Sequence, residues 1–376
     1  MDKRKILCIF GTRPEVIKMG PVIEAVQADP AFHVVNLATA QHREMLDDML
    51  QVFGIVPDHD LDIMTTDQKL VDVTSKCLLG IDAVLKRESP QMALVQGDTT
   101  TVMAAALVCH YNRVPLGHVE AGLRTSDKYA PFPEEMNRRI ASVLADMHFA
   151  PTQRARENLL REGVPESSIL VTGNTVVDAV LRIAACPDPD DASLERVRRF
   201  AARVERLLLV TAHRRESFGE PLRAVCQALS RILELFPDTG IVFPVHPNPN
   251  VRGPVYEILG ENPRVLLMEP LDYVQFVHVM KRATMVLTDS GGVQEEAPSL
   301  GKPVLVLRSK TERPEGIEAG VAWLVGTDPA RIVAEARRIL DSHRETTDRV
   351  LRQNPYGDGR AAERILQGIR EYLRME

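Results

Sequence analysis

The sequence lacks the features that would direct a chain into a membrane or onto a nucleic acid. No apolar run approaches the roughly 18–20 residues that a membrane-spanning helix needs. Residues 1–5 lead directly into a strand pattern, without the apolar core of a signal peptide. The formal net charge of −6 gives no reason to expect nucleic acid or an acidic membrane surface as a partner. We therefore expect a cytoplasmic protein whose positive charge is confined to particular sites.

The sequence also has few cysteines and no motif that would hold a cofactor. The cysteines are odd in number and lack CxxC spacing, which indicates reduced, mostly buried thiols. None of the histidine and cysteine spacings forms a metal-ligand cluster, and the GxGxxG fingerprint of dinucleotide-binding domains is absent. We therefore expect no metal and no cofactor. The cysteines are Cys8, Cys77, Cys109, Cys186 and Cys226.

Short apolar runs that alternate with helical patterns dominate what is present. The chain has 376 residues, of which 44% are hydrophobic and 26% charged, so it is long enough for two globular domains. Wholly apolar runs such as 6–10 are typical of parallel strands that are covered by helices on both faces. We expect an α/β protein with Rossmann-like domains at 1–184 and 185–359, and a final helix within 360–376 that crosses back to the first domain.

Two cations follow the first predicted strand. The segment GTRPE at 11–15 turns into a helix that carries Lys18, so Arg13 and Lys18 are about one helical turn apart. Two cations at this position suit an anionic ligand such as a diphosphate. The alternative is ordinary surface charge, but Arg13 lies in a constrained turn between Gly-Thr and Pro-Glu, which favours a functional role.

Three carboxylates follow later elements of the same predicted domain. Asp98 and Glu120 each come directly after a predicted strand, and Glu134 lies at the start of a predicted helix. Because the carboxyl ends of parallel strands meet at one edge of a sheet, we expect these side chains to converge. A converged set would perturb the pKa values of its members and supply acid and base groups. For Glu134 the alternative is that it only stabilises the helix N-terminus.

The second half offers a histidine and an aromatic ring as further candidates. His213 follows a predicted strand and is flanked by Arg214 and Arg215, which favours ligand or proton chemistry over a structural role. Phe276 lies in a predicted helix at 274–282, where its ring can stack on a base. Packing in the core is the alternative for Phe276.

The stretch 287–315 combines a strand, two glycines and the start of a helix. The strand ends at Ser290, Gly291 and Gly292 form a tight turn, and a helix is expected from residue 293. Free backbone N–H groups and the positive end of the helix dipole favour an anion at such a turn. Glu296, one helical turn further on, suits the hydroxyl pair of a ribose better than a second anion. An ordinary strand, turn and helix is the alternative.

A set of nine short motifs runs through the whole chain. Each motif is weak alone, but the set, in this order and spacing, is highly specific. With it the chain resembles the non-hydrolysing UDP-N-acetylglucosamine 2-epimerases along nearly its whole length. The motifs are GTRPE at 11–15, TAQHREML at 39–46, VQGDTT at 95–100, HVEAGLRT at 118–125, PFPEEMNR at 131–138, TGNTVVDA at 172–179, TAHRRES at 211–217, TDSGGVQEEAPSLGKPVLVLR at 288–308 and TERPE at 311–315.

The resemblance implies a fold and a reaction. The fold is the GT-B arrangement, in which two Rossmann-like domains face each other across a cleft that holds the active site, and the protein is a homodimer. The reaction interconverts UDP-GlcNAc and UDP-ManNAc and supplies ManNAc units for cell-surface polysaccharide. UDP is eliminated to give 2-acetamidoglucal, and it is added back after a proton returns to the other face of C2.

Matched motif by motif, the resemblance also assigns roles to residues. Asp98, Glu120 and Glu134 divide the proton chemistry at C2, and His213 serves the diphosphate together with Arg13. Phe276 lies against the uracil, and Glu296 binds the ribose. The implied substrate-binding residues are Arg13, Lys18, Phe276, Ser290, Gly291, Gly292, Glu296 and Arg313.

A second, activating UDP-GlcNAc site occurs in some bacterial members of this family. Gln41 and His42 match its motif and are therefore candidates for an allosteric site. Glu44 replaces a glutamine that is common there, and Asp67 stands where those members carry an arginine. These two replacements weaken the expectation of allosteric activation.

Four other functions are compatible with the same pattern. The chain could act on a modified UDP-HexNAc such as a 2,3-diacetamido sugar, or it could be a hydrolysing epimerase that releases free ManNAc. A GT-B glycosyltransferase would share the fold, but such an enzyme has little use for three acidic groups at the sugar. A module that only binds UDP-sugars would have no use for the carboxylates.

Overall fold

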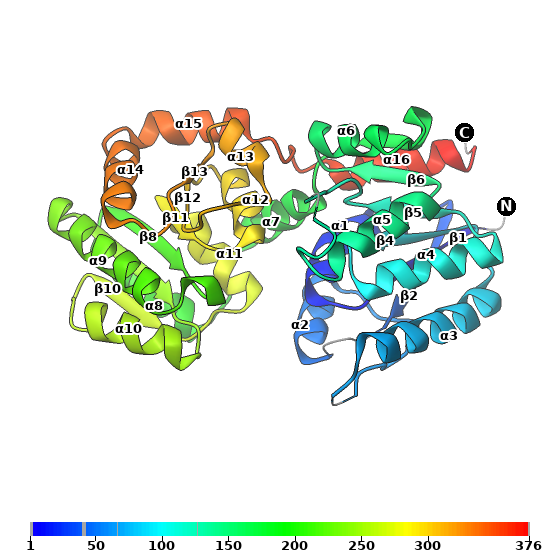
Figure 1. Cartoon of the computed structure of the whole chain (residues 1–376), viewed down its shortest axis with the longest axis horizontal. Coiled ribbons are helices and arrows are strands. Elements are labelled where there is room, and N and C mark those ends of the chain that lie inside the picture. Colours follow the sequence, from blue (N-terminus) through cyan, green and yellow to red (C-terminus); the bar gives the residue numbers. More distant parts are fainter. Residues whose placement is uncertain (1–2, 40–42, 66, 126, 375–376) are drawn as a thin grey trace. The chain divides into compact units, whose positions relative to one another are not determined.

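The computed structural model describes residues 3–39, 43–65, 67–125 and 127–374. No helix in these ranges is both long and apolar enough to cross a membrane. The predicted domain boundaries, after residues 184 and 359, lie a few residues beyond the observed ones. The chain divides into two compact units, which are Met1–Ala179 with Gly357–Glu376 (unit 1) and Val180–Tyr356 (unit 2) (Figure 1).

The described part of unit 1 contains one sheet of seven parallel strands in the order β3-β2-β1-β4-β5-β6-β7. Residues 6–10 of the central strand β1 are fully buried, as expected for a parallel strand that is covered on both faces. The strands are β1 (Arg4–Phe10), β2 (Phe32–Ala38), β3 (His59–Asp60), β4 (Met92–Gln96), β5 (Leu116–Val119), β6 (Met147–Ala150) and β7 (Ile169–Val171).

Helices pack on this sheet in two groups. One group places α1 against α2 and α16, and in the other α3, α4 and α5 lie side by side (Figure 1). Leu7 and Ile9 of β1 belong to the same core cluster as Ile81 of α3 and Val102 of α4. The helices are α1 (Arg13–Ala28), α2 (Arg43–Phe53), α3 (Leu70–Glu88), α4 (Thr100–Asn112), α5 (Glu134–Leu144), α6 (Gln153–Arg161), α7 (Thr175–Ala185) and α16 (Ala361–Tyr372).

Unit 2 contains a parallel sheet of six described strands in the order β10-β9-β8-β11-β12-β13. With two parallel-sheet α/β units, the prediction of two Rossmann-like domains is confirmed. The strands are β8 (Arg206–Thr211), β9 (Thr239–Pro244), β10 (Val265–Met268), β11 (Met285–Thr288), β12 (Val304–Val306) and β13 (Ala322–Leu324). The helices are α8 (Ala192–Ala201), α9 (Glu220–Leu235), α10 (Pro249–Leu259), α11 (Tyr273–Arg282), α12 (Gly291–Ser299), α13 (Pro314–Glu318), α14 (Pro329–Asp341) and α15 (His343–Gln353).

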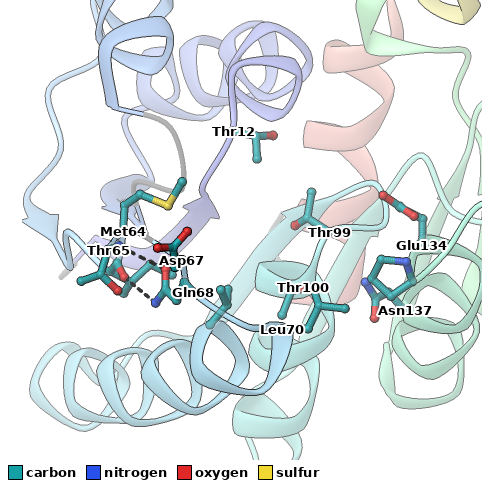
Figure 2. A pocket seen from close by; sticks show the side chains of 13 residues that line it. Thr12, Met64, Thr65, Asp67, Gln68, Leu70, Thr99, Thr100, Glu134 and Asn137 are labelled. Carbon is teal, nitrogen blue, oxygen red and sulfur yellow. Dashed lines mark hydrogen bonds between the residues drawn. The ribbon is translucent and has the colours of Figure 1, made fainter. Parts of the chain in front are cut away.

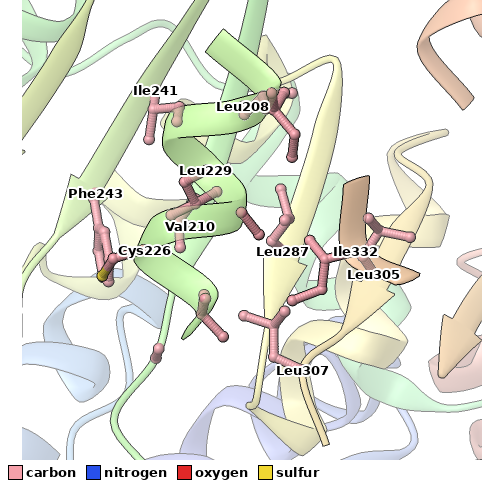
Figure 3. Close-up of a cluster of buried hydrophobic side chains, with 14 of the residues drawn as sticks. Leu208, Val210, Cys226, Leu229, Ile241, Phe243, Leu287, Leu305, Leu307 and Ile332 are labelled. Carbon is pink, nitrogen blue, oxygen red and sulfur yellow. The ribbon is translucent and has the colours of Figure 1, made fainter. Parts of the chain in front are cut away.

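A core cluster of unit 2 lies between its sheet and the helices α9, α10 and α14. Figure 3 shows part of it, where Val210, Leu287 and Leu305 from neighbouring strands meet Leu229 of α9 and Ile332 of α14. All five side chains are fully buried, so the central strands β8, β11 and β12 are held rigidly. Across the whole chain the cysteines are free thiols, of which Cys8, Cys77, Cys109 and Cys226 are buried and Cys186 is exposed.

A short non-helical segment separates β9 from α10. The prolines at 247 and 249 predict that no helix follows the strand immediately, and residues 245–248 are non-helical before α10 begins at Pro249 itself. Proline is tolerated in the first turn of a helix, where its missing N–H would have no partner in any case. The Asn248 side chain caps the helix by accepting a hydrogen bond from the Asn250 N–H at 2.9 Å. A proline pair therefore marks the start of this helix and does not exclude it.

Each sheet has one point where the strand order reverses. It lies between β1 and β4 in unit 1 and between β8 and β11 in unit 2. Open α/β sheets bind their ligands outside the carboxyl ends of the strands at such a point. The loops at these ends are 11–12 and 97–99 in unit 1, and 212–214 and 289–290 in unit 2. Five of the predicted site residues lie within these loops or directly next to them in the sequence.

Glu15 joins the two loops at the reversal point of unit 1. It is 2% exposed, and its Oε2 accepts hydrogen bonds from the Gly11 N–H at 3.0 Å and the Thr12 hydroxyl at 2.7 Å. Its Oε1 accepts a hydrogen bond from the Thr99 hydroxyl at 2.9 Å. Burial raises the pKa of Glu15 to about 7, and the hydrogen bonds oppose that effect. One buried carboxyl group thus fixes both loops, through neutral donors.

We expect the Glu15→Gln variant to gain stability relative to the parent protein between pH 5 and pH 8. The folded-state pKa of Glu15 lies above its ordinary value of 4.5. The folded parent therefore holds more protons than the unfolded chain between pH 4.5 and about pH 7, and its stability falls as the pH rises through this window. Glutamine does not titrate, so the difference in unfolding free energy should change by at most about 3 kcal/mol.

Urea unfolding of both proteins at pH 5 and pH 8 measures this change, and all other titrating groups are common to the two proteins. Glu157→Gln, at an exposed position of α6, serves as the control and should show the same difference from the parent at both pH values. A Glu15→Gln difference that is equal at the two pH values would contradict the effect of burial.

Candidate active site

Asp98 is held against the helix α5. It follows β4, and its Oδ2 accepts a short hydrogen bond from an Arg138 guanidinium N–H. The Asn137 side-chain amide donates to the Asp98 backbone carbonyl at 2.9 Å. Arg138 also donates to the fully buried Glu135 at 3.2 Å. The loop that carries Asp98 is therefore fixed to α5 from both its side chain and its backbone.

Glu134, the first residue of α5, faces a cavity of about 600 Å³. Its Oε2 is buried and has no hydrogen-bond partner in the described chain. A buried carboxylate oxygen without a partner is costly, so this atom is suited to contact a bound ligand. Figure 2 shows Glu134 and Asn137 on one side of the cavity. Thr12 and Thr99, from the two loops at the point where the strand order of unit 1 reverses, lie nearby. The lining residues are Thr12, Ile63, Met64, Thr65, Asp67, Gln68, Leu70, Val73, Thr99, Thr100, Pro133, Glu134 and Asn137.

Glu120 is buried at the end of β5 and is paired with Lys18. Its side chain is 4% exposed, and its Oε1 lies 2.5 Å from the Lys18 Nζ. Asn174 donates to the same oxygen at 3.2 Å, and Gln96 donates a short hydrogen bond to Oε2. The sequence predicts Lys18 at a diphosphate, so this contact with a carboxylate is a finding of the structure. Three donors around one carboxylate stabilise its negatively charged form.

The other predicted cation of this loop has a different environment. Arg13 is the first residue of α1 and its side chain is exposed. Thr12 precedes it, at the edge of the cavity, and is held by Glu15. The direct convergence of Asp98, Glu120 and Glu134 on one substrate remains a prediction, because Asp98 is bound to Arg138 of α5 whereas Glu120 is bound to Lys18 of α1.

His213 is organised by a buried aspartate of the neighbouring loop. Asp289 is fully buried, and its Oδ2 accepts hydrogen bonds from the backbone N–H groups of His213 and Arg214, both at 2.8 Å. The imidazole Nδ1 lies 3.3 Å from Oδ1, an ion-pair distance without hydrogen-bond alignment. Partial burial lowers the pKa of His213, and the Asp289 charge opposes that effect. The imidazole is therefore neutral at neutral pH, and it stacks on the His246 ring.

The glycines at 291 and 292 form the first turn of α12, and not a separate turn before it. The helix starts at Gly291, two residues earlier than the sequence predicts, with Ser290 as its N-cap. The Ser290 side chain makes no capping hydrogen bond, so the first N–H groups of α12 are available to a ligand. A Cβ atom added at Gly291 would meet nothing within 4 Å. This open, positively polarised helix end suits an anion.

Glu296 lies one turn further along α12 and is nearly buried. It is 7% exposed, and the Tyr273 hydroxyl donates to its Oε1 at 3.3 Å. Tyr273 is the first residue of α11, and Phe276 lies three residues later, on the same side of that helix. The contact between Tyr273 and Glu296 thus brings the predicted ribose and uracil residues of two helices into one region.

The loop that ends at Arg313 is tied to the same helix α12. Arg313 donates a short hydrogen bond from Nε to the buried Glu295. The Thr311 hydroxyl donates to the Gln294 side chain at 2.6 Å. The guanidinium of Arg313 is therefore engaged with the protein, and its prediction as a substrate-binding residue is untested.

The predicted allosteric residues Gln41 and His42 lie outside the described residues. Asp67 lines the cavity that Glu134 faces, and it has a left-handed backbone with a φ of 57°. An acidic side chain at this position adds no positive charge that could attract an anionic activator.

Sequence reasoning missed the residues that hold the predicted ones in place. Glu15, Gln96, Asn174, Arg138 and Asp289 all lie within the quoted motifs, but for all except Gln96 the sequence gives no reason to assign a role. A usable signal was the polar Gln96 at the end of an otherwise apolar strand. The pairing of Lys18 with Glu120 spans 102 positions and has no local signal.

Proteins of known family resemble this chain over nearly all its length. The family model described as UDP-N-acetylglucosamine 2-epimerase matches residues 24–370. The UDP-N-acetylglucosamine 2-epimerase of Salmonella typhimurium is 51% identical over 371 residues, which cover 98% of this chain and 99% of that protein.

Solved structures agree with this match. The crystal structure of UDP-GlcNAc 2-epimerase from Neisseria meningitidis bound to UDP-GlcNAc is 41% identical, with a TM-score of 0.89, and covers 98% of this chain and 100% of that chain. The S. aureus MnaA–UDP co-structure is 46% identical, with a TM-score of 0.85, and covers 99% of this chain and 98% of that chain. Because the family model and these relatives span the chain almost from end to end, it belongs to the UDP-N-acetylglucosamine 2-epimerase family of isomerases.

Proposed function

We propose that this chain is a cytoplasmic, non-hydrolysing epimerase that interconverts UDP-GlcNAc and UDP-ManNAc. Family membership supports the epimerase activity. Complexes of related proteins with UDP-GlcNAc and with UDP support the choice of substrate. The observation that carries the proposal is the unequal surroundings of the carboxylates in unit 1, because the reaction needs both a proton acceptor and a proton donor.

Unit 2 provides the groups that suit the UDP part of the substrate. The open N-terminus of α12 at Gly291 suits the diphosphate, and the neutral imidazole of His213 can hydrogen-bond to its oxygens. Glu296 accepts the ribose hydroxyls, and Phe276 lies against the uracil. Arg313 holds the loop 308–313 at the same helix through Glu295.

The chemistry requires the bond to UDP to weaken before C2 loses its proton. This proton is not α to a carbonyl, so it becomes acidic only as the C1–O bond breaks and its electron pair leaves with UDP. The helix end and Arg13 stabilise the negative charge that collects on the diphosphate. A carboxylate takes the C2 proton and 2-acetamidoglucal forms. A proton then returns to the opposite face of C2, and UDP adds back at C1 to give UDP-ManNAc, which supplies ManNAc units for cell-surface polysaccharide.

The carboxylates of unit 1 suit two different tasks in this sequence. Glu120, beside Lys18 and two amide donors, is stabilised as an anion, which suits a group that balances positive charge on the sugar or accepts a proton. Glu134 has a buried oxygen without a partner, which suits a group that exchanges a proton with the substrate. Asp98 accepts a hydrogen bond from the Arg138 guanidinium, and this contact keeps the Asp98 side chain in place beside the start of α4.

We also propose that the protein is a homodimer formed through the outer faces of α3, α4 and α5. These helices lie side by side and expose large apolar side chains, which are Leu79 at 75%, Tyr111 at 74% and Val143 at 82% exposure. Apolar side chains that gather on adjacent helices are typical of protein interfaces. A second copy of the chain is the partner that the family resemblance implies.

Incubation with UDP-GlcNAc in heavy water tests the proposed reaction. We expect NMR spectra to show UDP-ManNAc with deuterium at C2, in a mixture with UDP-GlcNAc that has also gained deuterium. Free ManNAc in amounts equal to the UDP formed would instead indicate a hydrolysing epimerase. Reaction only with an added acceptor or only with a modified UDP-HexNAc would indicate a glycosyltransferase or another substrate, and UDP binding without exchange would indicate a binding module.

A variant of Glu134 separates the proton chemistry from binding. Glu134→Gln keeps the shape of the side chain but cannot exchange a proton. We expect deuterium exchange at C2 to fall by at least about 100-fold, while the Kd for UDP changes less than about threefold. Glu157→Gln is the control and should exchange at the parent rate. An unchanged exchange rate in Glu134→Gln would remove Glu134 from the mechanism.

Blocking the start of α12 tests the proposed diphosphate site. Gly291→Val fills the open space at the helix N-terminus. No protein atom lies within 4 Å of the Cβ position, so the added side chain has room. We expect the Kd for UDP to rise at least about tenfold, because charge-assisted hydrogen bonds to the diphosphate are lost, with little change in Tm. Ala192→Val makes a similar addition at the first residue of α8 and should leave the Kd unchanged. A parent-like Kd in Gly291→Val would place the diphosphate elsewhere.

A charge on the outer face of α5 tests the homodimer. We expect light scattering after size exclusion to give twice the chain mass of 41.9 kDa for the parent and the mass of a single chain for Val143→Arg. Val56→Arg is the control, because Val56 is 78% exposed but lies outside these three helices. A Val143→Arg variant that remains a dimer would exclude this face.

A further inference from the structure

We propose that Gln96 and Asn174 are positioning residues that hold the Glu120 carboxylate in a single orientation for the chemistry at C2. This inference rests on the proposed function, in which Glu120 belongs to the carboxylate set of unit 1. It concerns two amide side chains that hydrogen-bond to Glu120 and that the family resemblance leaves without a role.

Glu120 needs such support because its backbone is in an unfavourable conformation. Its φ of 64° is in the left-handed region, which residues other than glycine rarely adopt. Gly122 follows with a φ of 94°, and a Cβ there would lie 2.2 Å from the Ala155 carbonyl oxygen of α6. The loop therefore turns sharply against α6. Strain of this kind persists only where the surroundings hold it in place, and it is concentrated at functional sites.

The surroundings of the Glu120 carboxylate come from three separate elements. Gln96, at the end of β4, donates to Oε2. Asn174, directly before α7, donates to Oε1 at 3.2 Å, where Lys18 of α1 also lies. Gln96 is 3% exposed and Asn174 is 2% exposed. Each oxygen thus has an amide donor of its own, and neither amide has access to solvent.

The direction of the Asn174 hydrogen bond is fixed by a second contact. Its Oδ1 accepts a hydrogen bond from the Val176 N–H at 3.1 Å, in the first turn of α7. The amide oxygen is thereby committed, and only the NH₂ group can face Glu120. The start of α7 therefore imposes a donor on the carboxylate. A carboxylate oriented in this way presents the same lone pairs to C2 in every catalytic cycle, and a misplacement by about 1 Å can cost a factor of about 100 in rate.

Lys18 and His118 are ionisable neighbours of Glu120, the first on α1 and the second on β5. Lys18 of α1 is in direct contact with Glu120. His118 of β5 is fully buried, and burial lowers its pKa to about 4, so it is neutral above that pH; its Nε2 lies 2.7 Å from the Gly97 carbonyl oxygen. Of these two groups, only Lys18 carries a positive charge that could balance a new carboxylate at position 174. Lys18 is already paired with Glu120.

The variant Asn174→Asp tests the proposal. Aspartate has the same shape and can still accept the Val176 hydrogen bond, but it places a second carboxylate at the position of the donor. We expect kcat for epimerisation to fall at least about 30-fold with KM for UDP-GlcNAc within about threefold, because the positioned carboxylate acts on the reacting sugar and not on UDP. The ascending limb of the pH–rate profile should move upward by at least about one pH unit, because two adjacent carboxylates resist double ionisation.

Asn112→Asp is the matched control. Asn112 also donates its amide to a carboxylate, that of Asp82 at 2.8 Å, but at the far end of α4. The same substitution there should leave kcat and the pH–rate profile unchanged. An Asn174→Asp variant with the kcat and pH–rate profile of the parent would overturn the proposal.

A second variant decides the question if Asn174→Asp does not fold. Gln96→Met keeps the length of the side chain and removes only the donor to Oε2. We expect at least about a tenfold loss of kcat with KM within about threefold, in protein whose Tm still rises on addition of UDP. A parent-like kcat in Gln96→Met would also overturn the proposal. If the parent protein itself shows no deuterium exchange at C2, the proposed function fails, and this outcome is distinct from a failure of the positioning role.

Discussion

A buried carboxylate that joins two loops is the contact on which the site of each unit depends. Parallel strands leave the loops at their carboxyl ends without partners from the sheet. In unit 1 Glu15 joins the loops after β1 and β4, and in unit 2 Asp289 joins the loops after β8 and β11. Both accept backbone N–H groups at the point where the strand order reverses. Arg13, Asp98 and His213 are each within two residues of the atoms that these carboxylates bind, and Ser290 directly follows Asp289.

The carboxylic acids of unit 1 differ in what surrounds them. This difference distinguishes an acid that holds loops in place from acids that suit the chemistry of the reaction. Glu15 is surrounded by neutral donors, and its raised pKa shows that burial outweighs them. Glu120 has amide donors as well as a cation, Lys18, which together stabilise its negative charge. Glu134 has an oxygen without a partner and a cavity in front of it. A group that must change its protonation during a reaction is best placed where no protein donor fixes its state, and among these three Glu134 fits that condition.

Local patterns in the sequence predict much of this structure, and long-range pairing accounts for what they miss. The strands Met92–Gln96 and Leu116–Val119 are predictable to the residue because short, mainly apolar runs have few alternatives to a buried parallel strand. The start of α12 was placed two residues late because glycine favours turns, although it is also tolerated in a first helical turn. The partner of Lys18 could not be predicted, since it depends on the distance between two loops and not on neighbouring residues.

The position of Lys18 changes how the charges of the substrate would be shared. A cation that already faces a buried carboxylate has less net charge to offer a diphosphate, because its field is largely cancelled at a distance. In the proposed function, Arg13, which is exposed, is then the cation of this loop that remains for the leaving group. Lys18 instead stabilises the Glu120 carboxylate as an anion. In the proposed function, one helical turn of α1 thus serves two groups, with Arg13 at the leaving group and Lys18 at Glu120.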